Sequence, residues 1–193
     1  MRVTGGRFGG LLLSVPKTDA LRPTQDRVRE ALFSMLQGEM SGAAFLDLFA
    51  GSGAVGLEAL SRGAASVTFV EQDARHLTTV RSNVAALERS PSANGHLACE
   101  TVRADVYRWL ATYAGAGFTV GFADPPYALG LVPETLSLLL RCGRVKPTSV
   151  IVCETANEDD VFMGDAALAE KFTVARAARY GAAFVTFLRP KEA

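Results

Sequence analysis

The feature that most constrains the fold is an alternation of short apolar segments with helix-like segments along most of the chain. The apolar segments are rich in β-branched or aromatic residues, as buried strands are, and cover residues 44–48, 66–70, 97–102, 118–123, 149–154, 172–176 and 183–188. Helical patterns lie between most of them, over residues 54–61, 74–87 and 132–140. This alternation predicts an α/β fold with a mainly parallel sheet and helices on both faces.

The last two apolar segments are joined differently from the others. Only residues 177–182 separate them, and this connection contains Tyr180-Gly181. A connection this short suits a hairpin and cannot hold a crossover helix. We therefore expect one reversed strand at the end of the parallel sheet.

The N-terminal part of the chain has a different pattern. Residues 1–21 contain the glycine pairs Gly5-Gly6 and Gly9-Gly10, which favour two short strands joined by a turn. The sequence thus predicts a β-hairpin extension over residues 1–21 and an α/β domain over residues 22–193. With 193 residues, of which 49% are hydrophobic, the chain has enough material for one sizeable core and not for two large domains.

A well-marked helix follows this extension. Thr24, after Pro23, is a suitable N-cap, and the apolar residues that follow recur at helical spacing: Val28, Ala31, Leu32, Met35 and Leu36. That stripe is most simply explained as a core-facing surface. Arg27, Arg29 and Glu30 lie off it, and the pattern leaves open whether the arginines of this region contact a ligand.

Composition excludes several classes of protein. Cys99, Cys142 and Cys153 form no C-x-x-C pair, and His76 and His96 are far apart in sequence, so we expect neither a disulfide framework nor a metal site. No apolar run reaches the length that a bilayer span needs, and the first residues lack the apolar core of a signal peptide. These observations favour a soluble chain in a reduced cytoplasm.

The net charge is zero, but the charges are unevenly distributed. Residues 1–36 and residues 175–193 each carry a net charge of +3, whereas the residues between them carry −6. Chance clustering on solvated faces explains this pattern, and so does a polyanion that contacts both ends of the chain. Charge by itself does not decide between the two explanations.

The first chemical motif follows the segment 44–48 and opens the next helix. It runs from Asp47 to Gly56 and spells G-x-G-x-x-G, which lets the backbone turn tightly and approach a nucleotide closely. Glu71 ends the next apolar segment, at the spacing of a carboxylate that binds ribose hydroxyls. Asp47 would repel a pyrophosphate but stabilise a cationic ligand such as S-adenosylmethionine. The alternative is that Asp47 caps backbone N–H groups of the loop.

The second motif is Asp124-Pro125-Pro126-Tyr127, directly after the segment 118–123. That position lies at the carboxyl edge of the sheet, where open α/β folds bind ligands. The Asp124 carboxylate and the Pro125 carbonyl can accept both N–H groups of an amine on a nucleobase, and Tyr127 offers a face for stacking. An ordinary turn after a strand would also use these residues.

These motifs together resemble the class I S-adenosylmethionine-dependent methyltransferases, whose fold is Rossmann-like. The run R-P-T-Q-D-R-V-R-E-A-L-F over residues 22–33, the loop L-D-L-F-A-G-S-G over residues 46–53 and G-L-E-A-L-S-R-G over residues 56–63 are similar to the RsmD family. Its members are bacterial 16S rRNA guanine-N2 methyltransferases. The resemblance covers nearly the whole chain.

The resemblance implies roles for individual residues. Asp47, Gly51 and Gly53 would surround the methionine part of the cofactor, Glu71 would bind its ribose and Asp105 would lie beside its adenine. The catalytic residues Asp124, Pro125 and Tyr127 would hold a guanine flipped out of the small-subunit rRNA. The resemblance also implies RNA contacts from the N-terminal region, by Arg7, Arg22, Arg27 and Arg29.

The expected reaction is direct methyl transfer from S-adenosylmethionine to guanine N2 without a covalent enzyme intermediate. The expected partner is 16S rRNA, naked or in a small-subunit assembly intermediate, and the chain is expected to act as a monomer. Two alternatives stay open: a DNA adenine-N6 methyltransferase, because D-P-P-Y also suits adenine, and a nucleic-acid-binding module with a vestigial cofactor fold. An NAD-dependent dehydrogenase would leave D-P-P-Y unexplained.

Overall fold

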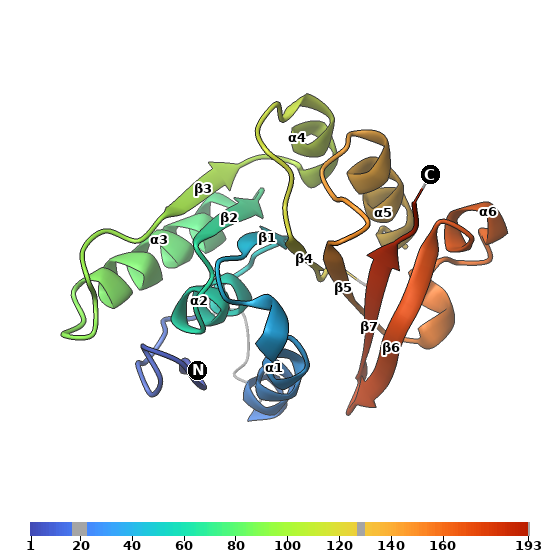
Figure 1. The fold of residues 1–193 in the computed structure, drawn as a ribbon. Coiled ribbons are helices and arrows are strands. Elements are labelled where there is room, and N and C mark those ends of the chain that lie inside the picture. The colour runs from blue at the N-terminus through green and yellow to red at the C-terminus, as the bar shows by residue number, and fades with distance from the viewer. Residues whose placement is uncertain (17–22, 127–129, 193) are drawn as a thin grey trace.

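The computed structural model describes residues 1–16, 23–126 and 130–192 (Figure 1). Its centre is one sheet with the strand order β3-β2-β1-β4-β5-β7-β6. The strands are β1 Ala44–Leu48, β2 Ser66–Glu71, β3 Cys99–Arg103, β4 Val120–Ala123, β5 Val150–Thr155, β6 Phe172–Tyr180 and β7 Ala183–Pro190. Each apolar segment singled out in the sequence contributes a strand, so the predicted sheet is confirmed.

Strand directions also follow the prediction. β1 pairs in parallel with β2 and β4, β2 pairs in parallel with β3, and β4 pairs in parallel with β5. β7 is the reversed strand, since it runs antiparallel to both β5 and β6. The hairpin is longer than expected, because β6 continues to Tyr180 and pairs with Ala183, which leaves Gly181 and Ala182 as the turn.

Helices cover both faces of the sheet (Figure 1). The helices are α1 Pro23–Met35, α2 Ala54–Ser61, α3 Ala74–Glu88, α4 Val106–Thr112, α5 Val132–Arg141 and α6 Ala166–Ala169, with short 3-10 turns at Gln37–Glu39 and Glu158–Val161. One face carries α1, α2 and α3, whose apolar residues form a core with side chains such as Phe45, Phe69 and Phe122. The other carries α4, α5 and α6 over a second core that includes Leu46 and Ile151.

Two helix predictions need correction. Helix α1 begins at Pro23, so Thr24 lies inside the helix and is not its N-cap; the fixed φ of proline suits the first helical position. Helix α4 was not predicted. It is short and begins after Asp105, whose Oδ1 accepts a hydrogen bond from the Arg108 N–H at 3.0 Å, and Trp109 anchors it in the second core.

The N-terminal segment folds back on itself without forming the two strands expected. Arg2 and Leu12 make an isolated antiparallel bridge, and Val3 N–H donates to the Leu11 carbonyl at 2.9 Å. Val3 and Phe8 are buried in the first core, so this segment packs firmly on the domain. The boundary predicted between residues 21 and 22 lies outside the described residues.

Side chains of α2 and α3 hold this segment in place. Ser61 Oγ donates to the Gly5 carbonyl at 2.6 Å and accepts the Phe8 N–H at 2.9 Å. The buried Asn83 amide donates to the backbone carbonyls of Ser14 and Ser52, both at 3.0 Å. The N-terminal segment and the loop after β1 are therefore tied to the same side chain.

Among the described residues, no helix is long and apolar enough to cross a membrane.

Candidate active site

The glycine-rich loop connects β1 to α2 at the carboxyl edge of the sheet. Gly53 has φ +76° and occupies the N-cap position of α2, a left-handed conformation that favours glycine. Gly56 lies where a Cβ atom would come within 2.3 Å of Phe69 Cε1, so only glycine lets α2 approach β2 this closely. The loop therefore presents backbone at the sheet edge, as the glycine pattern predicts.

Asp47 lies beneath this loop and is 2% exposed. Its Oδ2 accepts the Gly56 N–H at 2.9 Å, which is the capping contact considered as an alternative in the sequence. Burial and, to a smaller extent, the nearby Glu71 carboxylate raise the pKa of Asp47 to about 8, against the opposing effect of the hydrogen bond from Gly56. A cation placed beside Asp47 would favour the ionised carboxylate, so the contact with Gly56 and a role in binding a cation are compatible.

Glu71 is the last residue of β2, and it braces the loop from the neighbouring strand. Its Oε2 accepts the Gly51 N–H at 2.9 Å, and its Oε1 accepts the Asp73 N–H at 2.8 Å. His76 Nδ1 lies 3.8 Å from Oε2. Because each carboxylate oxygen can accept more than one hydrogen bond, the ribose contact implied by the resemblance is compatible with these bonds.

Four carboxyl groups lie on one side of this sheet edge. They belong to Asp47, Glu71, Asp124 and Glu154. Each is two residues beyond a side chain of the first core, respectively Phe45, Phe69, Phe122 and Val152, and strand side chains alternate between faces. Asp47 lies farther from the carboxyl edge of the sheet than Glu71 and Asp124 do. It pairs with Phe69 and Phe122, which come two residues before Glu71 and Asp124 respectively. The edge between β2 and β5 is therefore acidic on the face that α1, α2 and α3 cover.

Glu154 was not singled out in the sequence. The signal that could have identified it is the same spacing that applies to Asp47, since Glu154 ends an apolar alternation at the carboxyl end of its strand. It is half-buried and lines a small pocket together with residues of the D-P-P-Y motif, of the start of α5, and of the end of β5 and the turn after it: Pro125, Pro126, Gly130, Leu131, Val132, Thr155, Ala156 and Asp160.

Asp124 follows β4 directly, as predicted, and it is half-buried while Pro125 is buried. Burial, together with the Glu154 and Asp47 carboxylates, raises the pKa of Asp124 well above its usual value. Tyr127 lies outside the described residues. The structure thus brings Asp124 close enough to Asp47 for their charges to interact, so the second motif lies beside the first at one edge of the sheet.

Asp105 lies farther along the same edge, after β3. Its side chain caps α4, and it is half-buried. No hydrogen bond joins Asp105 to Asp47 or Asp124 in the described part of the chain. Its place at the end of the strand next to β2 suits the contact with adenine implied by the resemblance.

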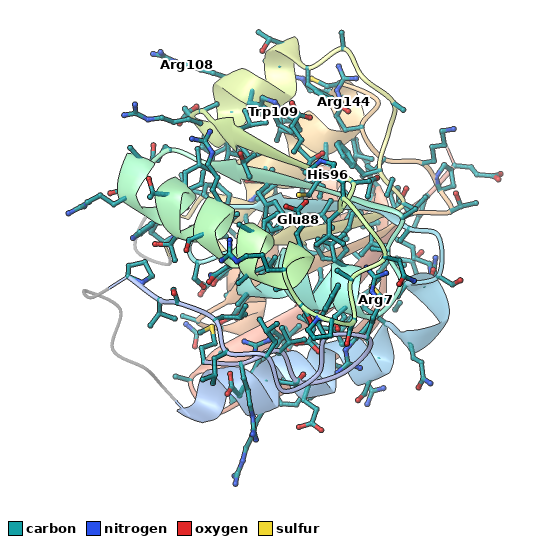
Figure 2. All side chains as sticks on the ribbon, turned by 90° about the vertical axis from the view of Figure 1, so that its left-hand side faces the viewer. Arg7, Glu88, His96, Arg108, Trp109 and Arg144 are labelled. Atoms are coloured by element: carbon teal, nitrogen blue, oxygen red, sulfur yellow. The ribbon has the colours of Figure 1, made fainter. Side chains whose placement is uncertain are left out.

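The four arginines expected to contact RNA differ in exposure. Arg7 and Arg27 are exposed. The guanidinium carbon of Arg7 lies 4.5 Å from the centre of the Phe8 ring. Figure 2 shows Arg7 projecting from the N-terminal segment, well away from Arg108 at the opposite end of the molecule. Arg22 lies outside the described residues.

Arg29, unlike Arg7 and Arg27, is buried. It is 4% exposed, and its guanidinium contacts Glu58, Asp26 and the Arg2 carbonyl. The helical spacing alone placed it off the apolar stripe, but the N-terminal segment covers that side of α1. Arg29 is therefore part of the interior and does not fit the RNA role predicted for it.

The comparisons with known proteins agree with this geometry. Residues 1–189 match the family described as Conserved hypothetical protein 95. The chain is 38% identical over 159 residues to Ribosomal RNA small subunit methyltransferase D of Escherichia coli, which covers 82% of this chain and 76% of the relative. This chain belongs to the RsmD family. It is also 35% identical to the methyltransferase D of Haemophilus influenzae, over 82% of this chain and 80% of the relative.

Solved structures give the same result for the fold of this RsmD-family chain. The Escherichia coli protein yhhF, presented as a candidate methyltransferase, superposes with a TM-score of 0.83 at 33% identity, covering 100% of this chain and 99% of that protein. The seven-stranded, mostly parallel sheet is thus the class I, Rossmann-like methyltransferase fold, and this member of the RsmD family is a methyltransferase.

Proposed function

We propose that this chain transfers a methyl group from S-adenosylmethionine to N2 of a guanine in the 16S rRNA of the small ribosomal subunit. One observation carries the proposal: Asp124 of the D-P-P-Y motif lies beside the glycine-rich loop at the carboxyl edge of the sheet, in a chain of the RsmD family. We further propose that the reaction takes place in the cytoplasm and that the chain acts as a monomer.

The residues at the sheet edge fit this cofactor. The left-handed turn at Gly53 brings the loop backbone to the sheet edge, the close packing at Gly56 seats α2 against β2, and the buried Asp47 matches the charge of a cationic methionine group. Glu71 and Asp105 would hold the ribose and the adenine. When bound, the cofactor supplies a methyl group on a sulfonium, which is already an activated leaving group.

The D-P-P-Y motif would hold the acceptor amine. The Asp124 carboxylate and the Pro125 carbonyl would accept the two N2 hydrogens of guanine, and the prolines restrict the backbone that carries them. Asp124 also stabilises the positive charge that develops on N2 as the methyl group is transferred. Tyr127 would stack on the flipped base.

The RNA would contact the exposed basic residues of the N-terminal region. Arg7 and Arg27 are both exposed, and Arg22 lies in the segment between them. Phosphate contacts from such residues position RNA without reading its sequence. Base identity must therefore be read in the pocket at the sheet edge.

The test is methyl transfer from labelled S-adenosylmethionine to naked 16S rRNA, to small-subunit particles and to genomic DNA, all prepared from a strain that lacks the activity. Nucleoside analysis should find the label as N2-methylguanosine in 16S rRNA. Label as N6-methyladenine in DNA would instead support the alternative enzyme. Cofactor binding without any transfer would support a binding module.

A further inference from the structure

Asp124 and Glu154 each come directly after a pair of residues that face each other on adjacent parallel strands. The register pairs Ala123, the last residue of β4, with Cys153 of β5, so Asp124 follows β4 at the level that Glu154 occupies on β5. Both continue the alternation of first-core residues, and their side chains therefore start from the same face of the sheet. Adjacent strands lie about 4.8 Å apart, so the two carboxyl groups are within reach of one small ligand.

Glu154 also lines the pocket beside the D-P-P-Y loop. Pro125, Pro126 and Leu131 also line this pocket, as do Thr155, the last residue of β5, and Asp160 in the turn that follows. The Asp160 carboxylate is occupied there, because its Oδ2 accepts the Asn157 N–H at 2.9 Å.

A second polar group that lines the pocket, the Thr155 hydroxyl, also has a hydrogen-bond partner. The Thr155 hydroxyl donates to the Asn157 carbonyl at 2.7 Å. Glu154 on β5 is the acidic lining residue that the strand register places next to Asp124.

Two adjacent carboxyl groups suit a ligand with adjacent donors. Burial and the Glu154 carboxylate raise the pKa of Asp124, and N–H groups placed between the two side chains would favour their ionised forms. The Watson–Crick edge of guanine presents such donors side by side, N1–H and the N2 amine. Adenine presents an N1 lone pair at the equivalent place, which a carboxylate repels.

We propose that Glu154 selects guanine: its carboxylate accepts the N1–H of the flipped base while Asp124 and the Pro125 carbonyl hold the N2 amine. This inference rests on the proposed function and adds to it the residue that reads the base. It explains how a D-P-P-Y site, which suits the amine of adenine as well, would be restricted to guanine. A pocket with a matched acceptor rejects a base that lacks the donor, because polar groups are then left unpaired.

The test replaces the target guanine with 2-aminopurine, which keeps the N2 amine but has a lone pair at N1. The substrate is 16S rRNA assembled by ligation, with guanine or 2-aminopurine at the position that the wild-type chain methylates. We expect the wild-type chain to methylate 2-aminopurine about 100-fold more slowly, measured as kcat/KM. Similar rates on the two bases would overturn the inference without any variant.

Glu154→Gln provides the second measurement, because its amide can donate to the N1 lone pair. The preference for guanine over 2-aminopurine should fall to about tenfold or less, through a slower reaction with guanine and a faster one with 2-aminopurine. A structural role for Glu154 would slow both reactions equally and leave the preference unchanged, which would contradict the inference. Glu158→Gln, at an exposed position of the following turn, is the matched control and should keep both rates.

Two further readouts separate the possible failures. Thermal unfolding and binding of S-adenosylhomocysteine show whether Glu154→Gln is folded; if it is not, Glu154→Asp should keep the preference for guanine at a lower rate, and loss of preference in that variant would contradict the inference. If the wild-type chain methylates guanine but does not discriminate, only the role of Glu154 fails. If it methylates no guanine in 16S rRNA, the proposed function and this inference both fail.

Discussion

The Arg29 guanidinium and the Glu58 carboxylate form a buried ion pair in which Nε lies 3.3 Å from Oε2 and the side chains are 4% and 0% exposed. Glu58 also accepts the backbone N–H of Thr4 at 2.7 Å and the Thr4 hydroxyl at 2.8 Å. Arg62 Nε completes the set at 2.8 Å from Oε1. One carboxylate on α2 thus connects α1 with the N-terminal segment.

Removal of this carboxylate should destabilise the chain strongly. Glu58→Ala removes the buried carboxylate that pairs with Arg29 and leaves the guanidinium only Asp26 and the Arg2 carbonyl, and breaking a buried ion pair from one side costs about 3–5 kcal/mol. The free energy of unfolding in urea measures the effect. Glu134→Ala, at an exposed position of α5, is the control and should change it by less than about 0.5 kcal/mol. An equal loss of unfolding free energy in the two variants would show that the Glu58 network does not contribute to stability.

This network also shows where sequence-based prediction ends. The strands and α2 and α3 follow from local alternation and helical spacing, so their positions could be predicted within a few residues. The burial of Arg29 depends on the N-terminal segment that covers it, a contact between distant parts of the chain that periodicity does not encode. Glu154 was not predicted as a site residue for a similar reason: its position beside Asp124 depends on the pairing of β5 with β4.

Arg27 should contribute to RNA binding without contributing to stability. It is exposed on α1, so Arg27→Ala should leave the unfolding temperature unchanged but weaken binding to 16S rRNA at low salt. Loss of one phosphate contact lowers the slope of log K against log salt by about one. Filter binding at several salt concentrations measures this slope. Arg141→Ala, on α5 across the sheet, should bind RNA as the wild-type chain does, and an equal loss in both variants would indicate a general charge effect.

Asp124 should be needed for transfer but not for cofactor binding. Asp124→Ala removes an acceptor for the N2 amine and the charge that supports the transition state, and we expect kcat to fall by about 10²–10³-fold. Calorimetry with S-adenosylhomocysteine should give the wild-type affinity, because the glycine-rich loop and Glu71 are untouched. Glu100→Ala, at an exposed position of β3, should retain turnover. Undiminished turnover in Asp124→Ala would exclude the assigned role.

Asp47 should make the stability of the unliganded chain depend on pH. Its pKa is about 8 in the folded chain and near 3.8 when unfolded, so between these values the folded chain holds a proton that the unfolded chain has lost. Stability should therefore fall as pH rises from 5 to 8, with a slope approaching about 1.4 kcal/mol per pH unit from this group. Asp124, whose pKa is also raised, acts in the same direction.

Asp47→Asn isolates the contribution of this side chain. Asparagine does not ionise, so the slope of the unfolding free energy between pH 5 and 8 should decrease, although the part due to Asp124 should persist. Asp73→Asn is the control: contacts with Arg75 lower the pKa of Asp73, so its carboxylate is ionised in both states above pH 5. Its curve should run parallel to that of the wild-type chain. Urea unfolding at several pH values gives these slopes, and equal slopes for Asp47→Asn and the wild-type chain would mean that Asp47 is ionised in the folded chain throughout this range.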